Sequence, residues 1–321
     1  MRALQVTEFK TTPALTDIPM PTPAEGEIRL RVETCGLNFA DLLMIRGEYQ
    51  ETPEPPFTLG LEAAGVVDAV GAGVTGVAEG DRVAVFGGFG GLAEYLVAPE
   101  AACLPLSDAM SFEAAAAFQI AYGTSHLGLT YRAELKAGET LLVLGASGGV
   151  GLTAVEIGKA LGARVIAVAR GADKLAVAKD AGAEILIDAG DEDLPQKLRA
   201  LGGIDVVYDP VGGALAQAAL RACARGARYL VIGFASGEVP DVRLNHLLVK
   251  NIAVHGFYWG GYATFDPAPM RASLRTLMEM FAGGQLTPHV GLSAPLDEAP
   301  AALEALRRRE TTGKVVIRLR D

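Results

Sequence analysis

The chain has 321 residues, of which 50% are hydrophobic and 21% charged, and its formal net charge at pH 7 is −10. This length suits two ordinary domains, and the composition is that of a globular rather than a disordered protein. The negative charge argues against nucleic acid or an anionic membrane as a main partner. The cysteines Cys35, Cys103 and Cys223 are isolated, and we recognise no signal segment or bilayer-spanning run. We therefore expect a reduced, cytoplasmic protein.

Residues 1–120 contain short alternating or β-branched runs separated by proline and glycine. The runs lie at 27–33, 64–70, 82–86 and 93–97. Short runs with this punctuation are typical of antiparallel strands joined by tight turns. The pattern predicts a compact, mostly antiparallel β domain over residues 1–120.

Strand and helix patterns alternate over residues 121–257. We expect strands at 141–145, 164–169, 184–188, 204–209, 227–232 and 252–256. This alternation predicts an α/β domain with a doubly wound parallel sheet. Residues 258–321 carry amphipathic helices at 270–283 and 299–309 and a last strand at 314–319. Because the six-stranded sheet is already complete, we expect residues 258–321 to return and complete the first domain.

A glycine-rich turn separates the apolar strand at 141–144 from a helical pattern at 152–161. Its glycines are Gly145, Gly148, Gly149 and Gly151. The order strand, glycine turn, helix places backbone N–H groups and a helix N-terminus where a pyrophosphate can bind. The spacing differs from the commoner G-x-G-x-x-G, and a glycine turn in another kind of α/β protein is the alternative. The predicted phosphate-binding residues are Ser147, Gly148, Gly149 and Val150.

Arg170 follows the second strand of this domain, where an NAD site would carry an acid that binds the ribose. An arginine cannot accept a hydrogen bond from a 2′-hydroxyl, but it can bind a 2′-phosphate. Lys174 lies one helical turn further on and can join it. The alternative is a solvated basic pair at a helix start, which the helix dipole slightly disfavours. The pair favours NADPH as the cofactor.

Several segments resemble the medium-chain dehydrogenase/reductase superfamily. The segment 60–65 (GLEAAG), followed by Gly71 and Val74, is similar to its signature, and 35–41 (CGLNFAD) resembles the preceding segment. The glycine turn and 312–317 (TGKVVI) extend the likeness over essentially the whole chain. Within the superfamily the chain is most similar to the zinc-independent, zeta-crystallin-like quinone oxidoreductases. The resemblance implies a Rossmann domain for NADPH and a GroES-like β domain that the C-terminal segment completes.

The chain departs from the zinc-dependent alcohol dehydrogenases at the positions of their zinc ligands. Asn38 and Leu61 stand at two of these positions, and 118–122 (FQIAY) has no Cys or His near the third. Zinc needs about three protein ligands at a catalytic site, so we expect no metal. Without this Lewis acid, hydride transfer to an already electrophilic conjugated acceptor is favoured over alcohol oxidation.

The resemblance also implies roles for individual residues. Asn38 would hydrogen-bond the cofactor or the substrate carbonyl, and Tyr49 would line the substrate cleft as a donor or an apolar wall. Asp41 and Glu62 are interpreted as structural. Cofactor contacts are further expected at Tyr122, Thr124, Gly233, Phe234, Phe257 and Lys314. The alternatives are packing for the aromatic residues, a helix-start role for Asn38 and an ordinary surface charge for Lys314.

The predicted function is NADPH-dependent hydride transfer to quinones or related α,β-unsaturated carbonyls, without zinc. An enoyl-thioester reductase of the same superfamily is one alternative. A non-enzymatic, crystallin-like protein that binds NADPH or RNA is another, which the acidic charge disfavours. By family analogy the protein is expected to be a homodimer.

Overall fold

The computed structural model describes residues 1–320. The chain divides into two compact units. The first comprises Met1–Ile120 together with the C-terminal segment from Pro288, and the second is Ala121–Thr287. Within residues 1–320, no helix is both long and apolar enough to cross a membrane.

The first unit is built on a seven-stranded sheet in the order β15-β16-β3-β5-β6-β8, with β7 also paired to β3. A second sheet has the order β2-β1-β4. All pairings are antiparallel except that of β15 with β16. The strands are β1 (Arg2–Val6), β2 (Ala14–Asp17), β3 (Glu27–Leu37), β4 (Phe57–Thr58), β5 (Glu62–Val70), β6 (Arg82–Phe86), β7 (Tyr95–Pro99), β8 (Cys103–Pro105), β15 (Val290–Pro295) and β16 (Lys314–Arg318). The helices are α1 (Phe39–Arg46), α2 (Phe112–Ala116) and α11 (Ala299–Arg307).

The long strand β3 shows why this unit folds as a sheet. Its side chains alternate between buried and half-buried along most of its length, and Ile28, Leu30 and Val32 are fully buried. Period-two burial places these three side chains on one face, in the core of the unit. The predicted antiparallel β domain, completed by C-terminal strands, is confirmed.

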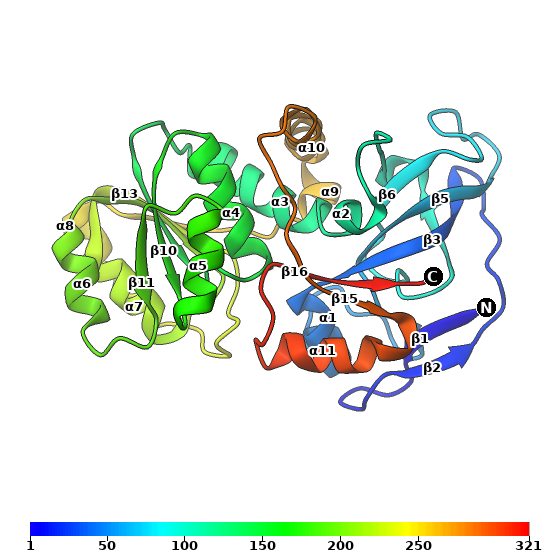
Figure 1. Ribbon diagram of the computed structural model, residues 1–321, viewed down its shortest axis with the longest axis horizontal. Coiled ribbons are helices and arrows are strands. Elements are labelled where there is room, and N and C mark those ends of the chain that lie inside the picture. The colour runs from blue at the N-terminus through cyan, green and yellow to red at the C-terminus, as the bar shows by residue number, and fades with distance from the viewer. Residues whose placement is uncertain (321) are drawn as a thin grey trace. The chain divides into compact units, whose positions relative to one another are not determined.

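The second unit contains a six-stranded sheet in the order β11-β10-β9-β12-β13-β14, and every pairing in it is parallel. Helices α4 and α5 pack on β9, β10 and β11, whereas α6 and α7 pack on each other and on the other face (Figure 1). The strands are β9 (Thr140–Leu144), β10 (Arg164–Ala169), β11 (Ile185–Asp188), β12 (Ile204–Asp209), β13 (Cys223–Val231) and β14 (Ala253–Gly256). The helices are α3 (Gln119–Leu127), α4 (Gly149–Ala160), α5 (Ala172–Asp180), α6 (Leu194–Leu201), α7 (Gly213–Ala222), α8 (Leu244–Lys250), α9 (Tyr262–Phe265) and α10 (Pro267–Ala282). The predicted doubly wound sheet is confirmed.

The return to the first unit starts at Pro288 and not at residue 258 as the sequence suggested. Residues 258–287, which include α9 and α10, pack within the second unit. Ser273 of α10 is buried and hydrogen-bonds His126 Nδ1 at 2.8 Å, and the ring of Tyr262 contacts that of Tyr131. Strand β15 was not predicted, because its sequence VGLSAP contains glycine and proline and lacks a clear alternation.

Close packing at the glycine turn depends on Gly151. A Cβ built on Gly151 would lie 2.1 Å from the carbonyl oxygen of Gly145, whereas one on Gly148 would meet the same oxygen at 3.4 Å. Gly148 also has an ordinary φ of −82°. The start of α4 can therefore lie against the end of β9 only while residue 151 has no side chain.

We predict that Gly151→Ala lowers the free energy of unfolding by about 1–3 kcal/mol, because the backbone must shift to relieve the overlap. Urea unfolding followed by far-UV circular dichroism measures this change. Gly148→Ala is the matched control and should unfold within about 1 kcal/mol of the wild type. Equal destabilisation by the two variants would contradict the packing argument.

Candidate functional site

The glycine turn lies at the carboxyl end of β9. Gly145 has a left-handed φ of 61°, and the N–H of Gly148 donates to the carbonyl of Gly145 at 3.0 Å. Gly148 is the N-cap of α4, and no side chain caps this helix end. The first N–H groups of α4 have no partner within the helix, so the turn presents donors and the positive end of the helix dipole to a ligand. Ser147, Gly148, Gly149 and Val150 all belong to this turn and helix start.

Loops after the neighbouring strands lie beside the turn. A Cβ on Gly145 would approach Val211, which follows β12, and one on Gly212 would approach Phe234, which follows β13. The carboxylate of Asp209 fixes the first loop by accepting the N–H groups of Val211 and Gly212 at 2.8 and 2.9 Å. The predicted residues Gly233 and Phe234 thus lie at the same sheet edge as the glycine turn, where open α/β sheets bind ligands.

Arg170 follows the last residue of β10 and is exposed. Gly171 is the N-cap of α5 with a φ of 84°, and Lys174 lies half-buried in the first turn of that helix. The carboxylate of Asp188, at the end of β11, accepts N–H groups from Gly190 at 2.8 Å and Gly171 at 3.1 Å. These bonds, and then the positive charge of Arg170, lower the pKa of Asp188. The Arg170 side chain therefore lies near the Asp188 carboxylate, which also fixes the backbone of the next residue, Gly171.

Tyr122 and Thr124 are both buried in α3. The hydroxyl of Tyr122 donates to Glu156 of α4 at 2.5 Å, and the other carboxylate oxygen of Glu156 accepts the N–H of Thr287 at 2.5 Å. Burial and the neighbouring carboxylate raise the pKa of Tyr122. The tyrosine hydroxyl thus joins α3 to α4, an interaction that the sequence did not reveal.

Phe257 is 6% exposed and packs inside the second unit. Its ring contacts the ring of Tyr262, with centroids 5.7 Å apart, and it lies 3.4 Å from a Cβ built on Gly128. Trp259 similarly covers Gly123. These contacts favour a packing role for Phe257 and Trp259, and for Phe257 this was the alternative to a cofactor contact.

In the first unit, a buried polar cluster surrounds Asn38, which is the N-cap of α1. Lys314 of β16 and Glu62 of β5 form an ion pair at 2.7 Å, and their side chains are 5% and 1% exposed. The Lys314 ammonium also donates to Asn38 Oδ1 at 2.7 Å and to the carbonyl of Leu37 at 2.8 Å. All three N–H donors of Lys314 are therefore engaged inside the unit. The alternative of an ordinary surface charge for Lys314 is wrong.

Glu62 and the amide nitrogen of Asn38 also take part in this cluster. The Asn38 amide nitrogen donates to Glu62 Oε1 at 3.0 Å and to the carbonyl of Gly36 at 3.2 Å. The second oxygen of Glu62 accepts the N–H of Ile120 at 2.9 Å. Glu62 was interpreted as structural from the sequence, and it is the residue that connects Asn38, Lys314 and Ile120.

Asp41 lies next to this cluster and is fully buried. Its carboxylate accepts the N–H of Asn38 at 2.7 Å and that of Gly60 at 3.1 Å. Burial raises the pKa of Asp41 to about 7, against the lowering effect of these bonds and of Lys314. Burial, and then the charges of Asp41 and Glu62, raises the pKa of the Cys35 thiol. Asp41 thus acts as the hydrogen-bond acceptor that the sequence suggested.

Tyr49 lies three residues beyond the end of α1 and is half-buried against the core of the first unit. Its carbonyl accepts the hydroxyl of Thr52 at 2.7 Å and thereby closes the turn after the helix. The two roles of its side chain, donor and apolar wall, stay predictions.

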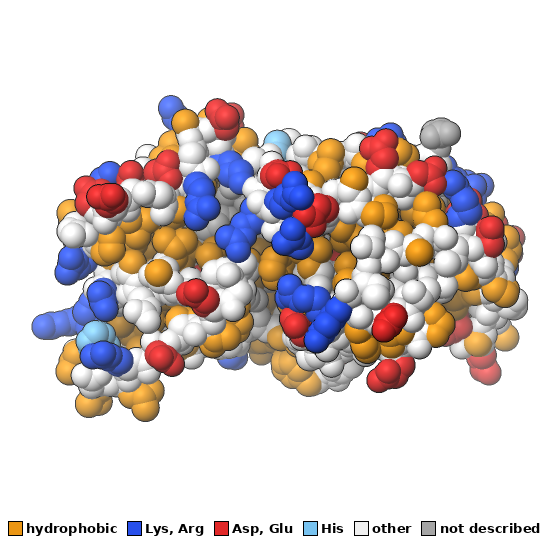
Figure 2. Space-filling model, turned by 90° about the horizontal axis from the view of Figure 1, so that it is seen from below, with side chains coloured by type: hydrophobic (Ala, Val, Ile, Leu, Met, Phe, Trp, Pro, Cys, Tyr) orange, Lys and Arg blue, Asp and Glu red, His pale blue; other side chains and the backbone are white. Residues whose placement is uncertain are grey.

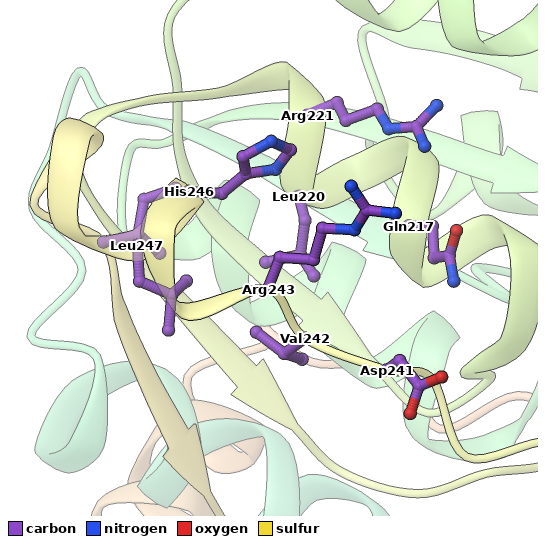
Figure 3. Close-up of a pocket in the computed structure, with 9 residues that line it drawn as sticks. Gln217, Leu220, Arg221, Asp241, Val242, Arg243, His246 and Leu247 are labelled. Atoms are coloured by element: carbon purple, nitrogen blue, oxygen red, sulfur yellow. The ribbon is translucent and has the colours of Figure 1, made fainter.

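Two other features bear on where a ligand binds. Among residues 1–320, no group of three or more His, Cys, Asp or Glu side chains could hold a metal ion. A surface pocket of about 230 Å³ lies between α7 and α8 and is lined by Arg221, Arg243 and His246, among others (Figure 3). None of the predicted site residues lines this pocket.

The chain is similar in sequence to known protein families and to individual proteins. A model described as "Alcohol dehydrogenase GroES-like domain" matches residues 24–108, and one described as "Zinc-binding dehydrogenase" matches residues 149–279. The quinone oxidoreductase-like protein 2 homolog of Nematostella vectensis is 40% identical over 298 residues, which cover 91% of this chain and 81% of that protein.

Two solved structures of quinone oxidoreductases in complex with NADPH share the fold. The Thermus thermophilus enzyme is 38% identical with a TM-score of 0.88, covering 99% of this chain and 100% of its own. The Escherichia coli enzyme is 31% identical with a TM-score of 0.91, covering 99% of this chain and 100% of its own. The chain therefore belongs to the medium-chain dehydrogenase/reductase superfamily and, within it, to the quinone oxidoreductase family.

Proposed function

We propose that this protein is an NADPH-dependent reductase that transfers hydride to quinones or related α,β-unsaturated carbonyls without zinc. The observation that carries the proposal is the uncapped start of α4 at the glycine turn, with Arg170 at the end of the adjacent strand β10. The structural relatives from Thermus thermophilus and Escherichia coli were crystallised with NADPH, which supports the same cofactor here.

The residues of the second unit fit the phosphates of this cofactor. The N–H groups at the start of α4 would hold the pyrophosphate, and the absence of a side chain at Gly151 lets this helix start lie against the end of β9. Arg170, with Lys174 in the next turn, would bind the 2′-phosphate. When bound, NADPH supplies the hydride, and a proton from water completes the reduction.

The residues of the first unit favour a conjugated acceptor. Asn38 and Leu61 stand where zinc-dependent relatives carry ligands, and neither side chain is a zinc ligand. A quinone or enone accepts hydride at carbon and leaves its charge on an oxygen that is stable enough to be protonated later. The chain then needs mainly to hold the reacting carbons close together and to stabilise the developing oxyanion with a few donors. Tyr49 is the proposed wall or donor for this acceptor.

The acceptor class can be tested with the purified protein by following NADPH oxidation by its absorbance. We expect turnover with 1,4-benzoquinone and with simple enones, and slower turnover with crotonyl-type thioesters. Faster reaction with the thioesters would favour an enoyl-thioester reductase. Binding of NADPH without turnover of any acceptor would instead support a non-enzymatic role and refute the proposal.

Cofactor choice should depend on Arg170. Because a charge-assisted bond to the 2′-phosphate is lost, Arg170→Ala should raise the KM for NADPH at least about tenfold and change that for NADH less than about twofold. Arg164→Ala, at the opposite end of β10, is the control and should leave both constants unchanged. Equal effects of Arg170→Ala on the two cofactors would contradict the assignment.

We further propose that the protein is a cytoplasmic homodimer. The short strand β14 is an edge of the parallel sheet, with one side unpaired in the described part of the chain. On the preceding helix α8, Leu244 and Leu248 are 76% and 77% exposed, and Val249 is 68% exposed. Figure 1 labels α8 at the left end of the molecule, and at the left end of Figure 2 hydrophobic side chains lie at the surface beside basic ones and a histidine. The three free cysteines fit a reducing compartment.

Light scattering after size exclusion should give twice the chain mass of 33.4 kDa. We place the contact between the two copies on β14 and the exposed face of α8. Leu244→Asp combined with Leu248→Asp puts two negative charges on that face and should yield the monomer at the same concentration. Met20→Asp, on an exposed site in the first unit, should remain dimeric. A wild type that elutes as a monomer at micromolar concentration would exclude the dimer.

A further inference from the structure

The polarity of the Asn38 amide is fixed by the chemistry of its neighbours. Lysine has only N–H donors, so the atom of Asn38 that faces Lys314 at 2.7 Å must be the oxygen. A carboxylate and a backbone carbonyl only accept, so the atom that faces Glu62 and Gly36 must be the nitrogen. These contacts together determine which way the amide lies.

This arrangement determines what Asn38 can offer to a ligand. Both protons of its nitrogen are already donated inside the unit, at 3.0 and 3.2 Å. Its oxygen accepts one bond from Lys314, and an amide oxygen has a second lone pair. Asn38 is half-buried, unlike the buried Glu62 and Lys314, so it is the member of this trio nearest to solvent. The amide can therefore accept one further hydrogen bond, and it has no donor left for a carbonyl.

The burial of the ion pair points to the same conclusion. A buried ion pair is often no more stable than well-packed apolar residues of the same volume, because removing two charges from water is unfavourable. Stability alone therefore gives no reason for the buried pair of Glu62 and Lys314. Each of the two charged groups holds one end of the Asn38 amide, which is the orienting role that such a pair can serve. At the start of α1 the Asp41 carboxylate accepts the N–H of Asn38, which is the reciprocal contact of a capping box and holds the backbone of Asn38 in place.

We propose that Lys314 and Glu62 are positioning residues that lock the Asn38 amide as a hydrogen-bond acceptor, so that the group it binds is a hydroxyl or N–H donor of the cofactor or of the substrate. This inference rests on the proposed function and changes one part of it. Asn38 would not stabilise the developing charge on a quinone oxygen. Lys314 would act through Asn38 rather than touch the cofactor itself.

A double-mutant cycle between Asn38→Ala and Lys314→Met tests this coupling. The binding constant for NADPH without acceptor and the KM and kcat for 1,4-benzoquinone are measured for the wild type, both single variants and the double variant. Removing one hydrogen bond to an oriented acceptor should weaken the affected constant about tenfold in each single variant. In the Asn38→Ala background, Lys314→Met should add less than about a twofold change.

The two possible donors give different results. If the donor belongs to NADPH, its binding constant weakens and the KM for quinone stays the same. If it belongs to the substrate, NADPH binding is unchanged and kcat/KM for the acceptor falls. Glu62→Gln combined with Lys314→Met removes both charges and lets Asn38 turn, and it should behave like Asn38→Ala. Lys10→Met, at an exposed lysine of the same unit, is the control.

Additive effects in the cycle would overturn the proposal, as would single variants that retain wild-type constants. Thermal unfolding of every variant separates loss of structure from loss of positioning. NADPH binding is read by fluorescence and does not require turnover. A protein that binds NADPH but reduces no acceptor refutes the proposed function, and unchanged NADPH binding in the single variants would then overturn this inference as well.

Discussion

The arrangement around Asn38 in the first unit depends on one buried ion pair, between Glu62 of β5 and Lys314 of β16. The two residues are 252 positions apart in sequence, and their side chains meet at 2.7 Å. Removing one partner would leave an uncompensated charge in the core, which typically costs about 3–5 kcal/mol. The pair therefore requires the C-terminal strand to return to the first unit, and it places the ammonium beside Asn38 at the start of α1.

The second unit satisfies a different constraint, which is the absence of a side chain where a helix starts. Gly151 lets α4 begin against the end of β9, and the helix end remains without a side-chain cap. Backbone donors thus face the sheet edge that also carries Arg170 and Phe234. One unit presents backbone N–H groups for phosphates, and the other holds a single oriented amide. In the proposed function, the glycine turn anchors the cofactor and Asn38 accepts one hydrogen bond from the cofactor or the substrate.

The sequence predicts those parts of the structure that follow from local rules. Gly145 and Gly151 reveal the glycine turn because a left-handed φ favours glycine and because the close approach at residue 151 excludes a side chain. The helix predicted at 270–283 is present as α10, but its assignment to the first domain was wrong, because an amphipathic pattern shows that Leu277 is buried and not what it packs against. The polarity of Asn38 was also beyond prediction, since Lys314 lies 276 positions away. One sequence signal does point to this contact. Lys314 begins the apolar strand 314–317, and a lysine that is buried with such a strand needs a charged or polar partner.

The central claim is that the Asn38 amide is locked before any ligand binds, and side-chain NMR of asparagine-labelled protein tests it most directly. We expect both amide protons of Asn38 to exchange slowly with solvent in the free protein, because both are donated to buried acceptors. On addition of NADPH or quinone this protection should stay the same, and in Lys314→Met it should be lost. Fast exchange in the free protein that becomes slow on ligand binding would contradict the account, because Asn38 would then be a donor to the ligand.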